Sequence, residues 1–104
     1  MQKSALDQAA AIRAGVLSPA ELIDSTREKM TALNPALNAI TWTRFEAAKQ
    51  DANQLEDHGQ PFFGVPLILK GLGQDFAGAP ATFGSRFFAK AKSEHTNNFV
   101  KALQ

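Results

Sequence analysis

The stretch from Gly64 to Gly73 constrains the fold of this chain most strongly. An apolar run from Val65 to Leu69, interrupted only by Pro66, lies between a glycine and a single lysine, Lys70. A short apolar run with these boundaries predicts a β-strand that is buried on both faces. A cation at the end of a buried strand is costly unless something uses it, so the role of Lys70 is the central question.

The residues before this stretch carry two helical patterns. Apolar side chains recur at helical spacing and predict a helix over residues 4–14. Ser18-Pro19-Ala20-Glu21 has the sequence of a capping box, which predicts the start of a second helix at Ser18. We expect this helix to end at Asn34, because Pro35 disfavours the helical conformation for the residue before it.

Shorter elements are predicted in the rest of the chain. β-Favouring residues predict a strand from Leu37 to Thr43, and helical spacing returns over residues 44–56. A glycine-rich loop is expected from residue 71 to residue 85, and a last helix is expected to begin at Thr96 or Asn97. Two strands are too few for a self-sufficient sheet, so we expect the chain to be the N-terminal part of something larger.

Composition narrows the classes of function. The 104 residues include 11 basic and 10 acidic residues, and the resulting charge of +1 gives no electrostatic reason to expect nucleic acid or an acidic membrane as partner. The absence of cysteine excludes disulfides, thiolate nucleophiles and cysteine-based zinc sites, and it favours the cytoplasm. Residues 1–17 lack the pattern of a signal peptide, and no apolar run approaches the ~18 residues of a membrane span.

The histidines and the glycine pair after Lys70 give weak signals. His58 and His95 lie in polar segments without neighbouring ligands at metal-binding spacing, so both are predicted to be solvated surface residues. Gly71-Leu72-Gly73 begins like a phosphate-binding loop, but Phe76 stands where the pattern needs its last glycine. The glycines are better explained as loop residues with positive φ.

Six phenylalanines between residues 62 and 88 admit two interpretations. As an aromatic stripe they would bind a planar ligand, whereas as core residues they would pack against one another. Base-stacking aromatics are expected among basic residues, and only Arg86 and Lys90 are near, so we predict core packing. The six are Phe62, Phe63, Phe76, Phe83, Phe87 and Phe88.

The residues alone leave two interpretations of the role of Lys70. A lysine at the end of a strand commonly extends its amine into solvent while its methylene groups cover apolar surface. A desolvated lysine instead loses its charge and can act as a base. Periodicity alone does not choose between the two.

Four ordered motifs carry a resemblance to a known family. They are Ser18-Pro19-Ala20-Glu21-Leu22, Leu33-Asn34-Pro35-Ala36-Leu37-Asn38-Ala39, Gly64-Val65-Pro66-Leu67-Ile68-Leu69-Lys70 and Gly78-Ala79-Pro80-Ala81-Thr82-Phe83-Gly84-Ser85-Arg86. Each motif is weak alone, but their order and spacing together are specific. Along nearly its whole length the chain resembles the N-terminal part of the amidase signature family.

The resemblance implies a fold and a chemistry. It implies an α/β fold with helices packed on a mixed β-sheet, with residues 1–104 as the N-terminal portion of a single α/β/α amidase domain. It also implies hydrolysis of small-molecule amides by a Ser–Ser–Lys triad, in which Lys70 is the catalytic lysine. The neutral amine would accept a proton, through a bridging serine, from the serine that attacks the carbonyl carbon. The resemblance implies no metal and no organic cofactor.

The rest of the triad is expected downstream of this chain. In the family both serines belong to a Gly/Ser-rich signature after the lysine, and no serine of this chain lies in such a context. We therefore expect the chain to be truncated before the signature and to be inactive alone. Ser85 is predicted to have a structural loop role. The unpaired strand at residues 65–69 is expected to make the fragment self-associate.

One position departs from the family pattern, and two alternative functions remain. The family commonly has an acidic residue after the lysine, where this chain has Gly71. Such a carboxylate could orient the lysine or the loop that follows. The first alternative function is an amidotransferase subunit acting on charged tRNA. The second is a non-enzymatic interaction module in which Lys70 is only a surface charge.

Overall fold

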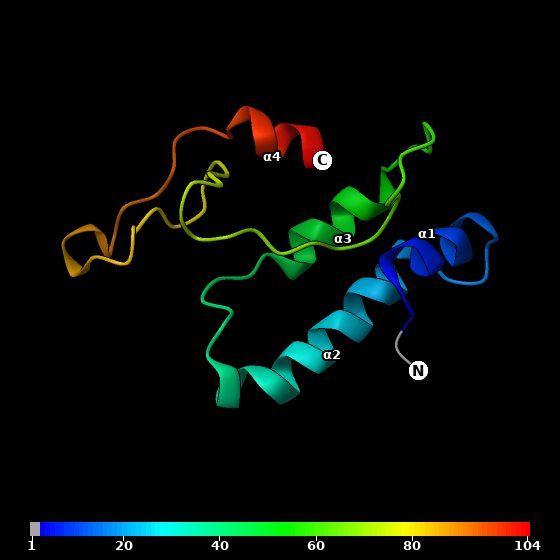
Figure 1. Ribbon diagram of the computed structural model, residues 1–104, viewed down its shortest axis with the longest axis horizontal. Coiled ribbons are helices and arrows are strands. Elements are labelled where there is room, and N and C mark those ends of the chain that lie inside the picture. The colour runs from blue at the N-terminus through cyan, green and yellow to red at the C-terminus, as the bar shows by residue number, and fades with distance from the viewer. Residues whose placement is uncertain (1–2) are drawn as a thin grey trace. The chain divides into compact units, whose positions relative to one another are not determined.

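The computed structural model describes residues 3–104, which form two compact units that divide between Leu67 and Ile68 (Figure 1). Helices make up most of the first, helical unit, and loops make up most of the second, loop unit. The described residues contain four α-helices, one 3₁₀ turn and no β-strand.

The predicted α/β fold, with helices packed on a mixed β-sheet, is therefore wrong for this chain. Residues 38–44 and 65–70 are irregular where strands were predicted. The physical reason is that an extended segment gains hydrogen bonds only beside a second strand. Within residues 3–104 neither segment lies beside one, so an apolar sequence alone does not produce a ladder.

α1 spans Ala5–Arg13 and begins with a capping box that sequence reasoning missed. The Ser4 hydroxyl accepts the backbone N–H of Asp7 at 3.1 Å. In return the Asp7 carboxylate accepts the backbone N–H of Ser4, also at 3.1 Å. The helix ends at Arg13 and Ala14 is its C-cap; Gly15 follows with a φ of 70°, in the left-handed region that favours glycine.

α2 spans Pro19–Leu37 and begins at the capping box predicted from the sequence. Glu21 donates its backbone N–H to the Ser18 hydroxyl at 3.1 Å, and its carboxylate accepts the Ser18 N–H at 2.8 Å. Pro19 takes the first helical position, where its missing N–H removes no helical hydrogen bond. The box and the proline together confirm the predicted start of this helix.

The end of α2 differs from the prediction because the helix continues through Pro35. Pro35 lies in the last turn and removes one helical hydrogen bond, the one that an N–H at this position would donate to the carbonyl of Thr31. The Asn34 side chain forms hydrogen bonds with the backbone beyond the helix. Its amide donates to the Ile40 carbonyl at 2.8 Å, and its oxygen accepts the backbone N–H groups of Ala39 and Ile40, each at 2.9 Å. Asn38 closes the helix in the left-handed conformation, with a φ of 50°.

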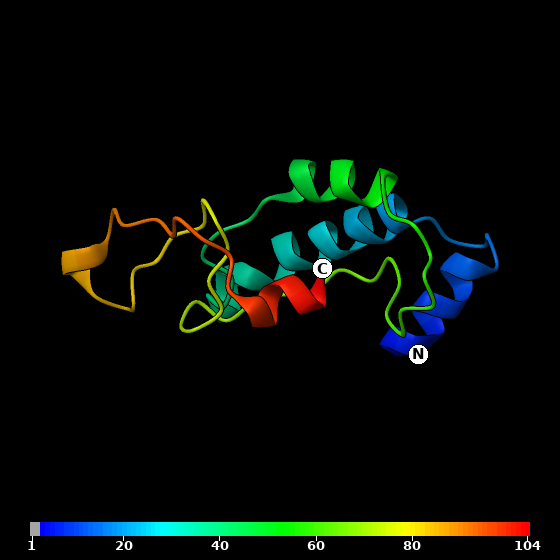
Figure 2. The same cartoon turned by 90° about the horizontal axis from the view of Figure 1, so that it is seen from above.

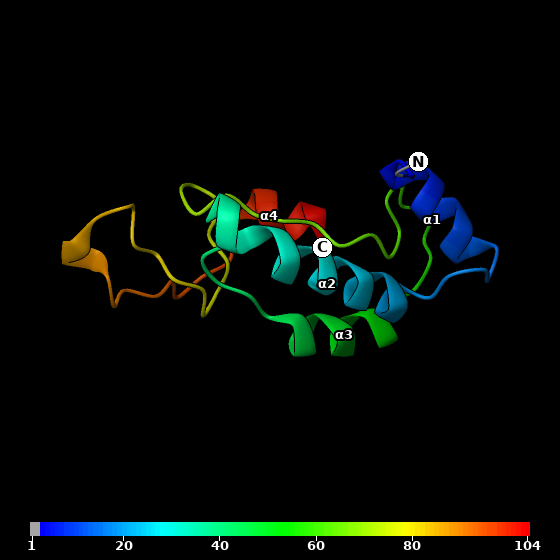
Figure 3. The same cartoon turned by 90° about the horizontal axis from the view of Figure 1, so that it is seen from below.

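α3 spans Phe45–Asn53 and lies beside α2 in all three views (Figures 1, 2 and 3). Two ion pairs connect the helices. The Lys49 ammonium lies 2.9 Å from a carboxylate oxygen of Asp24, and Arg27 lies 3.1 Å from Glu46. Pairs as exposed as these contribute little free energy, so they align the helices more than they stabilise them.

The loop after α3 is fastened to α1 by Arg13. Its guanidinium contacts both carboxylate oxygens of Asp57, at 2.8 and 3.1 Å, and donates to the Gln60 carbonyl. It also lies over the Phe63 ring, 5.5 Å from the centroid. The hydrogen bond from Arg13, followed by one from the Gly59 N–H, lowers the pKa of Asp57 below its ordinary 3.8.

The hydrophobic core is small. Its buried members are Ala9, Ile12, Leu22 and Ile23 in the helical unit and Val100 in the loop unit. The prediction that the six phenylalanines form a core is wrong: Phe62, Phe83, Phe87 and Phe88 are exposed, and Phe63 and Phe76 are only half-buried. Phe87, with 89% of its surface accessible, is the extreme case.

Two paired segments of the loop unit enclose the loop between residues 81 and 91. Three backbone hydrogen bonds of 2.8 to 2.9 Å join residues 78–81 to residues 91–93, around an isolated antiparallel bridge between Pro80 and Lys92. The enclosed loop contains the 3₁₀ turn Arg86–Phe88. α4 spans Asn98–Leu103, and Asn97 is its N-cap, one of the two caps predicted. None of the described helices combines the length and apolarity that crossing a membrane requires.

The Arg13–Asp57 pair predicts a pH dependence of stability. Since the folded-state pKa of Asp57 is lowered, its contribution to stability is complete above the unfolded pKa and is lost as pH falls through the folded pKa. We expect Asp57→Asn to be less stable than wild type at pH 7, and the difference to vanish towards pH 2. Urea unfolding at a series of pH values measures it.

The Arg13→Gln background provides the control for this prediction. Without its guanidinium partner, Asp57→Asn should change stability much less, and with little dependence on pH. A wild-type-minus-Asp57→Asn difference that stays constant from pH 7 to pH 2 would contradict the assignment.

Candidate active site

Lys70 lies where the irregular segment 65–70 enters a turn at residues 71–73. Its side chain is exposed, and none of the ion pairs found within residues 3–104 includes it. The sequence predicted a free-energy cost for a lysine at the end of a buried strand. Because Lys70 is exposed, its ammonium keeps its contact with water and this cost is absent. The predicted catalytic role of Lys70 remains a prediction.

A side-chain hydrogen bond closes the turn after Lys70. The Lys70 backbone N–H donates to the side-chain oxygen of Gln74 over 2.7 Å. Gly73 has a φ of 81°, a conformation that a residue with a Cβ rarely adopts. Gly71 differs, because a Cβ added there would meet no atom within 4 Å. Space therefore does not explain why this chain has glycine at the position where the amidase pattern commonly has an acidic residue.

Asn97 holds the same turn from the other side. Its side-chain amide donates to the Gly73 carbonyl at 2.9 Å, and its backbone N–H donates to the Asp75 carbonyl at 3.1 Å. The neighbouring Thr96 hydroxyl accepts the Ala77 N–H at 3.0 Å. The segment that follows Lys70 is thus tied to the start of α4 by three hydrogen bonds. Sequence reasoning identified Thr96 and Asn97 as caps but not as anchors of this loop.

Gly64 begins the segment that leads to Lys70 and makes close contacts with the helical unit. Its φ is 73°. A Cβ at this position would lie 2.9 Å from Pro19 Cγ and 3.0 Å from Ile12 Cδ1. Any larger residue would therefore collide with α1 and α2 in an already strained backbone conformation. Only glycine fits at this point.

The serines of the chain are mostly occupied by local hydrogen bonds. Ser4 and Ser18 cap helices, and Ser85 caps the 3₁₀ turn by accepting the Phe87 N–H at 3.2 Å, which fits its predicted loop role. The Ser93 hydroxyl donates to the His95 carbonyl at 2.7 Å. No hydrogen bond in the described part of the chain joins a serine to Lys70.

Both histidines lie at the surface, as predicted. The side chains of His58 and His95 are 71% and 70% exposed. His58 lies 3.5 Å from Glu56, and His95 lies 3.5 Å from Asp75, which makes each a surface contact with one carboxylate. Between residues 3 and 104 no three histidine, cysteine or acidic side chains gather as metal ligands would.

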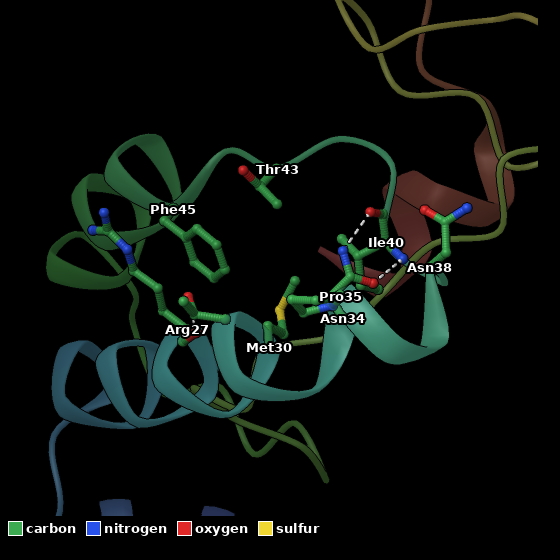
Figure 4. Close-up of a pocket in the computed structure, with 9 residues that line it drawn as sticks. Arg27, Met30, Asn34, Pro35, Asn38, Ile40, Thr43 and Phe45 are labelled. Carbon is green, nitrogen blue, oxygen red and sulfur yellow. Dashed lines mark hydrogen bonds between the residues drawn. The ribbon is translucent and has the colours of Figure 1, made fainter.

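The helical unit also contains an open depression of about 480 Å³ that sequence reasoning did not predict (Figure 4). It lies between the second half of α2 and the residues that lead to α3, with Met30, Asn34 and Phe45 among its lining residues. Its one charged side chain, Arg27, is paired with Glu46 and lies over the Phe45 ring. Without an acid–base pair, this depression offers packing but no evident chemistry.

Comparisons with known proteins give relatives in sequence. The chain is 43% identical to a lipoamidase from Enterococcus faecalis over 99% of its own length and 14% of the relative. It is 34% identical to an acylamidase from Rhodococcus erythropolis, over 80% of this chain and 18% of the relative. It is 39% identical to a putative amidase AmiC from Mycobacterium leprae, over 78% and 17%. No family model matches the chain, and no solved structure matches it.

These relatives confirm the resemblance to amidases that the four motifs carry. The chain spans only 14% to 18% of the length of the three curated relatives that it matches. The similarity therefore concerns one segment of those enzymes.

The contacts of Gly64 predict a large difference between two glycine substitutions. Gly64→Ala should lower the free energy of unfolding by more than about 1 kcal/mol, because the left-handed backbone and the contacts with Pro19 and Ile12 both oppose a Cβ. Gly71→Ala is the matched control and should be neutral or slightly stabilising, since its surroundings are open. Chemical denaturation of both variants tests this; equal effects would contradict the assigned contacts.

Proposed function

Because this chain is related along almost its whole length to one segment of bacterial amidases, we propose that the complete protein hydrolyses carboxamides with Lys70 as its catalytic lysine. The observation that carries this proposal is the match to relatives named as amidases. The segment from Gly64 to Lys70 of this chain is one of the four motifs on which the family was predicted.

The proposed chemistry is a proton relay. A nucleophilic serine attacks the amide carbonyl carbon and passes its proton to a bridging serine, which passes its own proton to the neutral Lys70 amine. The ammonium then returns the proton through the same path to the leaving amine as the C–N bond breaks. Water attacks the resulting acyl-serine by the same relay, which releases the acid and restores the enzyme.

Lys70 must be neutral to begin this relay. Desolvation favours the neutral amine over the ammonium, but Lys70 is exposed in this chain. The surroundings that remove water from it must therefore come from parts of the complete protein outside residues 1–104. The exposed position of Lys70 thus fits a catalytic residue whose pocket is not built by this chain.

The chain alone is proposed to be inactive, because it offers no serine for the relay. Four of its five serines have their hydroxyls engaged in helix caps or tight turns, and Ser25 lies exposed on α2 in the helical unit. Both triad serines are instead assigned to a Gly/Ser-rich segment of the complete protein. The sequence alone predicted that none of these serines belongs to the triad. The structure adds that four of them form local hydrogen bonds.

The names of the relatives favour hydrolysis over amide transfer to tRNA. They are a lipoamidase, an acylamidase and a putative amidase. The greatest identity among these three is to the lipoamidase, so lipoamide is the first substrate to test, with a short primary carboxamide for comparison.

The proposal predicts that Lys70→Ala abolishes turnover of the complete protein. Loss of the proton acceptor should lower kcat at least about a hundred-fold, with Lys70→Arg equally inactive because a guanidinium does not lose its proton at neutral pH. Release of amine or ammonia from lipoamide and from the short amide measures this. The 104-residue chain alone should release neither.

Lys90→Ala is the matched control, since Lys90 is another exposed lysine of the loop unit and has no assigned role. It should retain wild-type kcat. Full activity in Lys70→Ala would refute the catalytic assignment, and so would a complete protein that lacks any Gly/Ser-rich serine pair.

We also propose that the isolated chain self-associates through its exposed phenylalanines. Phe83, Phe87 and Phe88 pack edge to face, with ring centroids 5.7 and 5.0 Å apart, yet all three remain exposed. Such clusters favour contact with a second copy. The average mass in light scattering should rise with concentration, less so for Phe87→Ser than for the control Val16→Ser. A constant monomer mass would exclude this proposal.

A further inference from the structure

We propose that Gln74 is the positioning residue for Lys70, and that it acts by accepting the Lys70 backbone N–H. This inference rests on the proposed catalytic role of Lys70 and adds a second residue to it. Gln74 does not exchange protons with the substrate in this assignment. It fixes the backbone from which the Lys70 side chain departs.

The hydrogen bond itself is the first support. Its length of 2.7 Å is at the short end for an N–H donor and a neutral oxygen, and it closes a turn of five residues, from Lys70 to Gln74. No strand lies beside Lys70 within the described residues, so this N–H has no ladder partner. The Gln74 side chain therefore takes the place that a neighbouring strand would occupy.

The lack of a side chain at Gly71 is the second support. An acidic residue directly after the lysine could orient it or its loop, but glycine offers no such group and leaves the backbone free. Gln74 is half-buried and provides a polar group that reaches back to Lys70. The turn is thus held by a side chain three residues further along than the family pattern suggests.

Asn97 supplies the third support, because it fixes the residues on both sides of Gln74. The carbonyls of Gly73 and Asp75 each accept a hydrogen bond from Asn97. With both neighbours held, the Gln74 backbone has little freedom, and its side chain reaches Lys70 from a fixed origin. This arrangement suits positioning, since a supporting residue must itself be rigid.

The consequence for catalysis follows from the length of the lysine side chain. Its flexible stem places the amine accurately only if the backbone direction at Lys70 is constant. Errors of about 1 Å in a reacting group cost up to a hundred-fold in rate. Loss of the Gln74 contact should therefore reduce kcat and leave substrate binding nearly unchanged.

The test compares three glutamine substitutions in the complete protein. Gln74→Leu removes the accepting oxygen at similar volume and should lower kcat about five- to ten-fold, with KM within about two-fold of wild type. Gln74→Glu keeps an accepting oxygen and should retain most of kcat. Gln60→Leu is the matched control, because Gln60 also accepts a backbone N–H, that of His58, at 2.7 Å. It should leave kcat unchanged.

A second measurement detects the hydrogen bond directly and does not depend on enzymatic activity. In the 104-residue chain, amide hydrogen exchange at Lys70 should be protected in wild type and in Gln74→Glu, and should lose this protection in Gln74→Leu. An unprotected Lys70 amide in wild type overturns the inference, even if Gln74→Leu is too unstable for kinetics.

The outcomes separate this inference from the proposed function. An inactive wild-type protein, or an active Lys70→Ala variant, refutes the proposed function. An active wild type with inactive Lys70→Ala and unchanged kcat in Gln74→Leu refutes only the role of Gln74. Equal losses in Gln74→Leu and Gln60→Leu also refute it, because they would reflect general destabilisation.

Discussion

The close approach of Gly64 to α1 and α2 determines where the chain leaves its helical unit. Its missing Cβ lets the backbone come within contact distance of Pro19 and Ile12, and its positive φ turns the chain into the segment that carries Lys70. The two capping boxes matter for the same reason, since they fix the starts of the helices against which Gly64 rests. Most of the buried side chains lie on those two helices.

The helix starts were predictable because their hydrogen bonds join residues within one turn. Features that depend on residues further along the chain were not predicted. Ser18 to Glu21 predicts a helix start because all of its hydrogen bonds fall within one turn. The end of α2 was misjudged, because the last turn accommodates Pro35 while the Asn34 side chain binds residues five and six positions ahead. A prediction based on the preference of the residue before proline does not include such contacts.

The failure of the predicted strand has a different cause. Val65 to Leu69 has the composition of a buried strand, but burial and pairing depend on neighbouring strands, and residues 3–104 supply none. Leu67 and Ile68 are consequently exposed, as are most of the phenylalanines assigned to a core. Lys70 was predicted through its motif, and its role stays a prediction. No sequence pattern indicates Gln74, because its hydrogen bond to the Lys70 N–H depends on the conformation of the turn between them.

Asn97 connects the start of α4 to the turn after Lys70 within the loop unit. One side chain caps α4 and also binds Gly73, while the same residue's N–H binds Asp75. The first turn of α4 and the turn after Lys70 therefore share Asn97 as a common hydrogen-bonding residue. A displacement of Asn97 would therefore alter the hydrogen bonds to Gly73 and Asp75, on either side of the residue whose side chain binds the Lys70 N–H.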